Sequence, residues 1–228
     1  MASTALITGA SRGLWLALAR ALAASGWRLV IDARGAPALE AARRELAAHT
    51  EVTALVGDVS DERHRRALVT AAGDRIDALV NNASILGPSP QPALDAYPLD
   101  VLEDVLKVNA LAPLRLIQLA LPAMPEGARI VNVTSDAAVE AYEGWGGYGA
   151  SKAALEQITQ VLAVERPQLA VYAFDPGDMN TAMHQEAFPG EDISDRPPPE
   201  DSVPALLALL TGDLPSGRYR DADVKVTH

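Results

Sequence analysis

Short, mostly apolar runs alternate with longer amphipathic segments along most of this chain. The short runs are typical of buried strands, and apolar residues at helical spacing predict helices packed on a sheet. The predicted strands are residues 4–8, 28–32, 52–58, 76–83, 128–135 and 169–175, with a short last strand within 217–224. The predicted helices are residues 14–24, 37–49, 60–72, 99–121, 148–164 and 201–210.

Strand and helix alternate about six times. This order predicts crossover connections and a mainly parallel sheet covered by helices on both faces. No repeat at a fixed period and no linker divides the chain. We therefore predict one α/β domain over residues 1–228, a doubly wound sheet of about seven mainly parallel strands.

Three local signals refine this outline. Ser60 is a candidate N-cap for the third helix, and Pro113 predicts a kink or bend within residues 99–121. Residues 176–200 have little periodicity and many Pro and Gly residues. Loops of this length are usually functional or disordered, so we expect a surface loop or lid there.

Composition removes several function classes. The 228 residues carry a net charge of −11 at pH 7, which disfavours binding to nucleic acid or to an anionic membrane. There is no cysteine, which excludes disulfides, thiolate metal sites and cysteine nucleophiles. No His and carboxylate cluster has metal-ligand spacing, so we predict no metal. With no signal-peptide pattern and no apolar run approaching about 18 residues, we expect a cytoplasmic protein without a membrane span.

The stretch TGASRGLW, residues 8–15, follows the first strand and opens the first helix. This context favours a phosphate-binding turn for a dinucleotide, because glycine permits a tight turn and the helix N-terminus offers free N–H groups and a positive dipole end. Ser11 and Arg12 add polar and cationic groups. The candidate phosphate-binding residues are Gly9, Ser11, Arg12, Gly13 and Leu14.

Trp15 stands where such a motif normally has its last glycine. Three interpretations compete. In the first, the indole ring swings outward or repacks locally and the cofactor still binds. In the second, the ring fills or distorts the cofactor cleft and redox chemistry is lost. In the third, the residue was introduced deliberately. The sequence does not separate them.

A second group of residues suits proton transfer on a carbonyl. Tyr148 and Lys152 are four residues apart in a predicted helix and share a face, and Ser135 ends a predicted strand. Tyr148 would exchange a proton with the substrate oxygen, Lys152 would lower the tyrosine pKa and hold the ribose, and Ser135 would hydrogen-bond that oxygen. Asn109 would anchor a water that relays protons to Lys152. A nicotinamide would supply the hydride.

Across essentially its whole length the sequence resembles the short-chain dehydrogenases/reductases. The resemblance rests on TGASRGLW, GDV at 57–59, NNAS at 81–84, VNA around Asn109, Ser135, YGASK at 148–152 and DPGDMNT at 175–181. It implies a Rossmann-type dinucleotide-binding domain, a substrate lid at about 176–200, and the catalytic tetrad Asn109, Ser135, Tyr148 and Lys152. Ser84 stands where the NNAS segment of that family usually ends in glycine. The further cofactor contacts that the resemblance implies are Asp58, Val59, Asn82, Ala83, Tyr148, Lys152, Pro176, Gly177 and Thr181.

The end of the second strand predicts which nicotinamide is used. In the resembling family an acid there selects NAD, and this chain has Ala33 at that position. Asp32 should point the other way, because side chains alternate along a strand. Arg34 and Arg12 would pair with a 2′-phosphate, so we predict NADP(H) over NAD(H). The alternative is that Arg34 is only a solvent-facing charge.

Two functions remain open at this point. One is an NADP(H)-dependent oxidoreductase that interconverts a carbonyl and a secondary alcohol on a small organic substrate. The other is a protein of the same fold whose cofactor binding is impaired by Trp15, acting as a non-redox enzyme or a binding subunit. The resemblance also implies a homodimer or homotetramer that pairs through residues 99–121 and 148–164. Trp145 either lines the substrate mouth or packs locally, and His184 is either a solvated loop residue or a second acid–base group.

Overall fold

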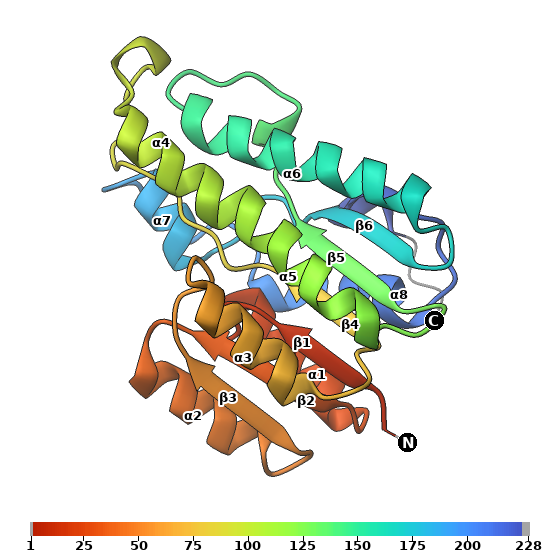
Figure 1. Ribbon diagram of the computed structural model, residues 1–228. Helices are drawn as coiled ribbons and strands as arrows, with labels where there is room; N and C mark the ends of the chain where they lie inside the picture. The colour runs from red at the N-terminus through yellow and green to blue at the C-terminus, as the bar shows by residue number, and fades with distance from the viewer. Residues whose placement is uncertain (1, 225–228) are drawn as a thin grey trace.

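The computed structural model describes residues 2–224 and has a single seven-stranded sheet with helices on both faces (Figure 1). All neighbouring strands run parallel, in the order β3-β2-β1-β4-β5-β6-β7. The strands are β1 (Thr4–Ile7), β2 (Arg28–Ala33), β3 (Val52–Val56), β4 (Ala78–Asn81), β5 (Arg129–Val133), β6 (Ala170–Asp175) and β7 (Gly217–Arg220). The helices are α1 (Gly13–Ala24), α2 (Ala36–Leu46), α3 (Glu62–Ala72), α4 (Leu99–Leu106), α5 (Ala112–Ala120), α6 (Gly146–Glu165), α7 (Ala182–Ala187) and α8 (Val203–Thr211). The doubly wound fold predicted from the sequence is confirmed.

Alternate residues of each central strand enter two separate cores. Ala5 and Ile7 of β1 pack with apolar residues of α1, α2 and α8, whereas Leu6 packs with α3, α5 and α6 on the opposite face. Both faces of the sheet are buried, which is why the strands appear in the sequence as continuous apolar runs rather than as alternating ones.

The strand order reverses direction between β1 and β4. From β1 the chain builds outward to β3, and from β4 it builds outward in the other direction to β7. In open parallel sheets the helices diverge at such a point and leave a crevice at the carboxyl ends of the strands. The loops after β1, β4, β5 and β6 therefore meet at one edge.

The long helix predicted at 99–121 is interrupted. A π-helical turn at Lys107–Leu111 separates α4 from α5, in which Pro113 is near the first residue. Pro113 has no N–H to donate to the carbonyl of Asn109 four residues earlier, and the helix widens at this point instead of breaking. By length and mean hydropathy, 1.2, the 25-residue run Leu99–Ala123 would also suit a membrane-spanning helix. Its inner face, which includes Leu116 and Ile117, is packed into the core.

Two local predictions are corrected. The N-cap of α3 is Asp61, whose carboxylate accepts a hydrogen bond from the Arg63 N–H, whereas Ser60 lies one residue earlier. Residues 176–200 are not entirely a loop, because α7 forms within them. Thr181 caps α7 by accepting a hydrogen bond from the His184 N–H.

Candidate active site

A cleft of about 900 Å³ opens at the carboxyl edge of the sheet. It is bounded by the β1–α1 turn, the loops after β2, β4 and β5, the N-terminal turn of α6 and the 176–188 segment. Every residue predicted to contact the cofactor lines it: Gly9, Ser11, Arg12, Gly13, Leu14, Arg34, Asp58, Val59, Asn82, Ala83, Tyr148, Lys152, Pro176, Gly177 and Thr181. The structure thus brings together segments that are far apart in the sequence.

The β1–α1 turn depends on its two glycines. Gly9 and Gly13 have φ angles of 70° and 59°, a region that side chains other than glycine rarely adopt. A Cβ at Gly9 would lie 2.7 Å from the Asn82 amide nitrogen, and that amide donates hydrogen bonds to the carbonyls of Thr8 and Gly9. The turn is therefore packed against the end of β4.

The N-terminus of α1 has the features of an anion site. Its N-cap, Arg12, makes no side-chain capping hydrogen bond, and the first turn carries no acidic residue. The free N–H groups and the helix dipole favour a negative group, and the glycines leave room for it beside the backbone. These residues fit the diphosphate of a dinucleotide.

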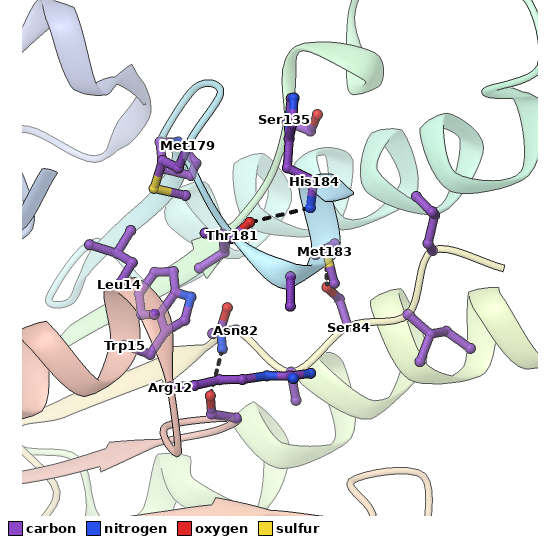
Figure 2. A pocket seen from close by; sticks show the side chains of 18 of the residues that line it. Arg12, Leu14, Trp15, Asn82, Ser84, Ser135, Met179, Thr181, Met183 and His184 are labelled. Carbon is purple, nitrogen blue, oxygen red and sulfur yellow. Dashed lines mark hydrogen bonds between the residues drawn. The ribbon is translucent and has the colours of Figure 1, made fainter. Parts of the chain in front are cut away.

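Trp15 is the third residue of α1 and lines the cleft. The indole is 7% exposed and belongs to the same core cluster as Leu14 and Leu18, with the partly buried Met179 packed against that cluster. Figure 2 shows the ring beside Leu14 and below Met179. The ring forms part of the cleft wall, and the cleft extends past it to the glycine turn. This geometry favours local repacking of Trp15 over a filled cleft.

Sequence reasoning missed a buried pair behind the turn. The Asp32 carboxylate accepts a hydrogen bond from the Gly9 N–H at 2.8 Å, and its other oxygen lies 2.8 Å from Nε2 of the buried His64 on α3. A Cβ at Gly57 would overlap the His64 ring, so Gly57 makes room for the histidine. Asp32 does point away from the position of Ala33, as expected, and both of its oxygens are engaged within the protein.

Ser135, Tyr148 and Lys152 all line the cleft. Tyr148 and Lys152 lie on one face of α6, with the Lys152 ammonium 5.4 Å from the centre of the tyrosine ring. Lys152 Nζ donates to the Val133 carbonyl at 2.8 Å, which fixes the ammonium at the end of β5. Ser135 follows β5 by two residues and donates from Oγ to the Asp136 carboxylate at 2.9 Å.

Burial dominates the ionisation of this pair. Desolvation, with smaller contributions from Asp175 and Asp136, raises the pKa of Tyr148 above its ordinary value. Desolvation also lowers the pKa of Lys152 to about 8. The direction for Tyr148 is opposite to the one expected from Lys152 alone, because burial and the two carboxylates outweigh the ammonium.

Asn109 does not line the cleft and lies behind it, in the π-helical turn. Its amide nitrogen donates to the Ile85 carbonyl and to Ser151 Oγ, and its oxygen accepts from the Ile85 N–H, each at 2.9 Å. These bonds join the loop after β4 to α6. The proton-relay role of Asn109 stays a prediction, and the contacts show a positioning role.

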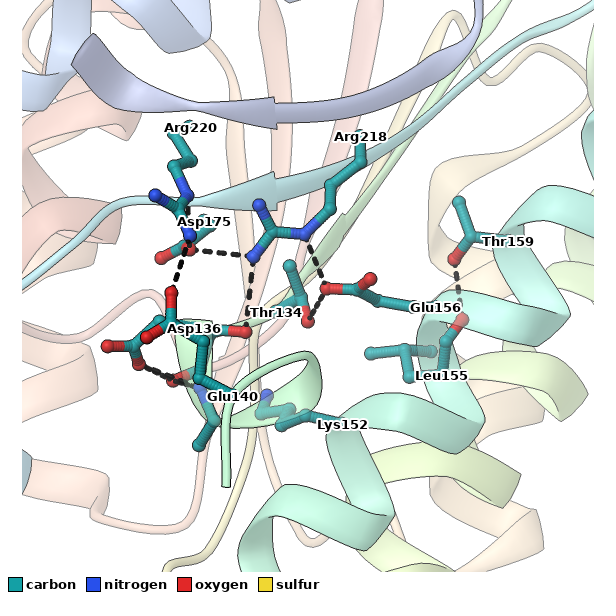
Figure 3. Close-up of polar contacts among 12 residues, drawn as sticks. Thr134, Asp136, Glu140, Lys152, Leu155, Glu156, Thr159, Asp175, Arg218 and Arg220 are labelled. Carbon is teal, nitrogen blue, oxygen red and sulfur yellow. Dashed lines mark hydrogen bonds and ion pairs between the residues drawn. The ribbon is translucent and has the colours of Figure 1, made fainter. Parts of the chain in front are cut away.

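A buried ionic network holds the Ser135 backbone in place, and no sequence pattern indicated it. Arg218 of β7 bonds the carboxylates of Glu156 on α6 and Asp175 at the end of β6, at 2.9 and 2.8 Å, and reaches the Ser135 carbonyl (Figure 3). Thr134 donates to the same Glu156 oxygen. Both carboxylates are only 5% exposed. Through Arg218, β7 is thereby bound to the loop after β5 that contains Ser135.

Among residues 2–224, no group of three or more His, Cys, Asp or Glu side chains is arranged to hold a metal ion. The polar side chains of Ser135, Tyr148 and Lys152 share the cleft with the glycine turn.

Comparison with known proteins agrees with this geometry. The family model described as short chain dehydrogenase matches residues 3–192. The rhamnolipids biosynthesis 3-oxoacyl-[acyl-carrier-protein] reductase of Pseudomonas aeruginosa is 37% identical over 171 residues, which is 71% of this chain and 66%, just under two thirds, of that relative.

Two solved structures are also similar. A short chain dehydrogenase from Pseudomonas syringae superposes with a TM-score of 0.89 at 29% identity, over 96% of this chain and 94% of that one. A short chain dehydrogenase from Escherichia coli, complexed with NADPH, gives a TM-score of 0.84 at 28% identity, over 96% of both chains. With this fold, this cleft and these matches, the chain belongs to the short-chain dehydrogenase/reductase family of oxidoreductases.

Proposed function

We propose that this protein reduces the carbonyl of a small organic substrate to a secondary alcohol with NADPH, and catalyses the reverse reaction with NADP⁺. The observation that carries the proposal is that Tyr148 and Lys152 share one face of α6 in the cleft that also contains the glycine turn. An acid–base pair and a site for a dinucleotide thus open into the same space.

The proposed chemistry assigns one task to each residue. When substrate binds, the Ser135 hydroxyl turns from the Asp136 carboxylate, donates its hydrogen bond to the substrate oxygen instead, and orients that oxygen toward Tyr148. Tyr148 donates its phenolic proton to that oxygen, and the nearby Lys152 ammonium stabilises the phenolate left behind. Asn109 keeps the loop after β4 attached to α6. Bound in the cleft, a dihydronicotinamide supplies the hydride.

We further propose that NADP(H) is preferred over NAD(H). Arg12 and Arg34 are both exposed on the cleft rim, where guanidinium groups would meet a 2′-phosphate. Asp32 cannot easily serve the 2′-hydroxyl of NAD, because both of its oxygens are already engaged with Gly9 and His64. The NADPH complex of the Escherichia coli structure supports the proposal.

Replacing Arg34 by alanine tests the preference. The KM for NADPH will rise by about tenfold, the effect of losing one charge-assisted contact with a phosphate, while the KM for NADH stays nearly constant. Steady-state kinetics with each cofactor measure this. Arg63, an exposed arginine on α3 that does not line the cleft, provides the control Arg63→Ala. An equal rise for both cofactors would contradict a role at the 2′-phosphate.

The lowered Lys152 pKa predicts the pH dependence of reduction. Because burial disfavours the charged form, the ammonium is present below about pH 8 and is lost as the pH rises through that value. The kcat/KM for carbonyl reduction, which reports the free enzyme, will fall over the same interval. In Lys152→Arg the side chain stays charged, so the absolute rate will be lower but the fall near pH 8 will disappear. If the fall in kcat/KM near pH 8 persisted in the arginine variant, it would have to come from the ionisation of another group.

A screen of aldehydes and ketones for loss of NADPH absorbance tests the proposed function directly. Binding of NADPH, measured by calorimetry, distinguishes the proposed reductase from the alternative in which Trp15 impairs cofactor binding. A protein whose cleft is blocked by Trp15 would bind no NADPH, and Trp15→Gly would restore binding. Saturable binding and turnover by the unaltered chain would exclude that alternative.

We also propose a homodimer or homotetramer that pairs through the two long helical segments. Their outer faces expose apolar side chains, among them Leu111 on the α4–α5 segment and Val161 and Val164 on α6, at 57%, 44% and 82%. Burial of such side chains against a second copy would remove this apolar surface from water.

A further inference from the structure

Four aromatic rings form a continuous band along the substrate side of the cleft. Tyr148 is in edge contact with Trp145, whose ring centre is 5.8 Å away. Trp145 contacts Phe188 at 5.8 Å, and Phe188 lies against His184 at 4.9 Å. All four residues line the cleft, so the band runs from Tyr148, the proposed proton donor, to α7 and its C-cap residue Phe188.

His184 ends the band with an unused polar atom. Its side chain is 11% exposed, and Nε2 is buried with no hydrogen-bond partner within residues 2–224. Nδ1 is 3.7 Å from an Asp178 oxygen, too far for a good hydrogen bond. The cap that Thr181 provides to the His184 N–H holds the start of α7 in place (Figure 2). A buried polar atom without a partner is costly, and a ligand that supplies one is favoured.

Charges of both signs lie at the substrate end of the cleft. Asp136 and Asp178 both line the cleft, one beside Ser135 and one beside His184. Arg196 Nε is 3.9 Å from Asp178, and the Lys152 ammonium lies beside Tyr148. These opposite charges offset one another, so this end of the cleft suits a neutral substrate, whereas Arg12 and Arg34 belong to the cofactor end.

We infer that the band formed by Tyr148, Trp145, Phe188 and His184 selects neutral aromatic carbonyl compounds that carry a second oxygen, such as aryl vicinal diketones. The inference rests on the proposed function. The aryl ring packs on Trp145 and Phe188, which places its carbonyl at Tyr148. His184, with its proton on Nε2, donates to the second oxygen after a rotation of its ring that brings the buried Nε2 to the cleft surface. Reduction converts the carbonyl at Tyr148 to a secondary alcohol with the hydride of NADPH and the tyrosine proton, and the second oxygen is unchanged.

Three matched substrates test the two parts of the inference. Phenylpropanedione has both the ring and the second oxygen, cyclohexylpropanedione lacks the aromatic ring, and propiophenone lacks the second oxygen. We expect kcat/KM of the unaltered enzyme to be about tenfold higher for phenylpropanedione than for either of the others, the size of one aromatic or hydrogen-bond contribution.

Two variants then assign the preference to residues. His184→Phe keeps a ring against Phe188 but removes Nε2, so the loss of kcat/KM will be about tenfold greater for phenylpropanedione than for propiophenone. Trp145→Leu will reduce the phenyl-over-cyclohexyl preference severalfold. Glu186→Gln, an exposed position on α7 that does not line the cleft, is the matched control and will retain the substrate preference. An unchanged affinity for NADPH in each variant shows that the cleft is intact.

The possible outcomes distinguish failure of the inferred substrate preference from failure of the proposed reductase function. If the enzyme reduces carbonyls without an aryl preference, or if His184→Phe affects diketone and monoketone equally, the inference is overturned and the proposed reductase remains. If the unaltered chain binds NADPH but reduces none of the three substrates, the inference is overturned as well. Reduction of other aldehydes or ketones by the same protein would then still support the proposed reductase function.

Discussion

Replacing Tyr148 by phenylalanine will lower kcat/KM for carbonyl reduction by about 10³-fold, within the range that general acid catalysis contributes. The change removes only the hydroxyl. The phenyl ring keeps the edge contact with Trp145 and stays beside the Lys152 ammonium. Because burial raises the pKa of Tyr148, its proton is retained at neutral pH until the substrate oxygen accepts it. The loss will therefore appear in kcat, while NADPH affinity changes little.

Tyr142→Phe is the matched control for this prediction. Tyr142 is exposed and also lines the cleft, and its hydroxyl lies 3.0 Å from an Asp136 oxygen and 2.9 Å from a Glu140 oxygen, to one of which it donates. We expect its kcat/KM to stay within about threefold of the unaltered enzyme, as is usual for loss of a solvent-exposed hydrogen bond. Stopped-flow measurement of NADPH oxidation gives both values. If Tyr148→Phe kept most of its activity, the proton donor would have to be another group.

The largest loss of stability will follow Arg218→Leu, by about 3–5 kcal/mol in the free energy of unfolding. The guanidinium is the common partner of Glu156 and Asp175, and both carboxylates are nearly fully buried. Leucine fills part of the volume but leaves two like charges in the core, with only the more distant Arg220 Nε, 3.9 Å from Asp175, beside them. Denaturant unfolding followed by circular dichroism measures the change.

Arg44, an exposed arginine on α2, is the control. It pairs with Glu40 at 2.9 Å, and the two side chains are 74% and 41% exposed. Arg44→Leu will therefore cost less than about 1 kcal/mol. A similar cost for both arginines would mean that the buried network contributes no more than a surface ion pair. Since Arg218 also holds the Ser135 carbonyl, its leucine variant will lose activity at temperatures where it is still folded.

The fold followed from the sequence because each strand is a short apolar run and each helix an amphipathic one. The parallel sheet buries both strand faces, so strands and helices differ clearly in periodicity. Ends of elements were harder to place. Ser60 and Asp61 are both good caps, and the choice depends on backbone geometry that the sequence does not state. The short helix α7 was missed because six residues among many breakers have no clear periodicity.

That the residues predicted to bind the cofactor line one cleft also followed from the sequence, because the carboxyl ends of parallel strands converge at one edge. The groups that hold the site in place did not. His64 and Arg218 belong to segments rich in charged residues, RHRR on α3 and RYR on β7, where a solvated role is the ordinary expectation. Their burial depends on partners 32 and 43 or more residues away in the chain, and no local pattern reveals such pairs.

The arrangement of Asp32, His64 and Gly57 restricts how this chain can evolve. A larger residue at 57 displaces the imidazole, loss of the imidazole leaves the carboxylate at 32 without its partner, and loss of the carboxylate frees the Gly9 amide. A substitution at any one of these positions is therefore harmful until another compensates it. In descendants of this sequence the three should be exchanged together, as a correlated set, and single changes should be rare.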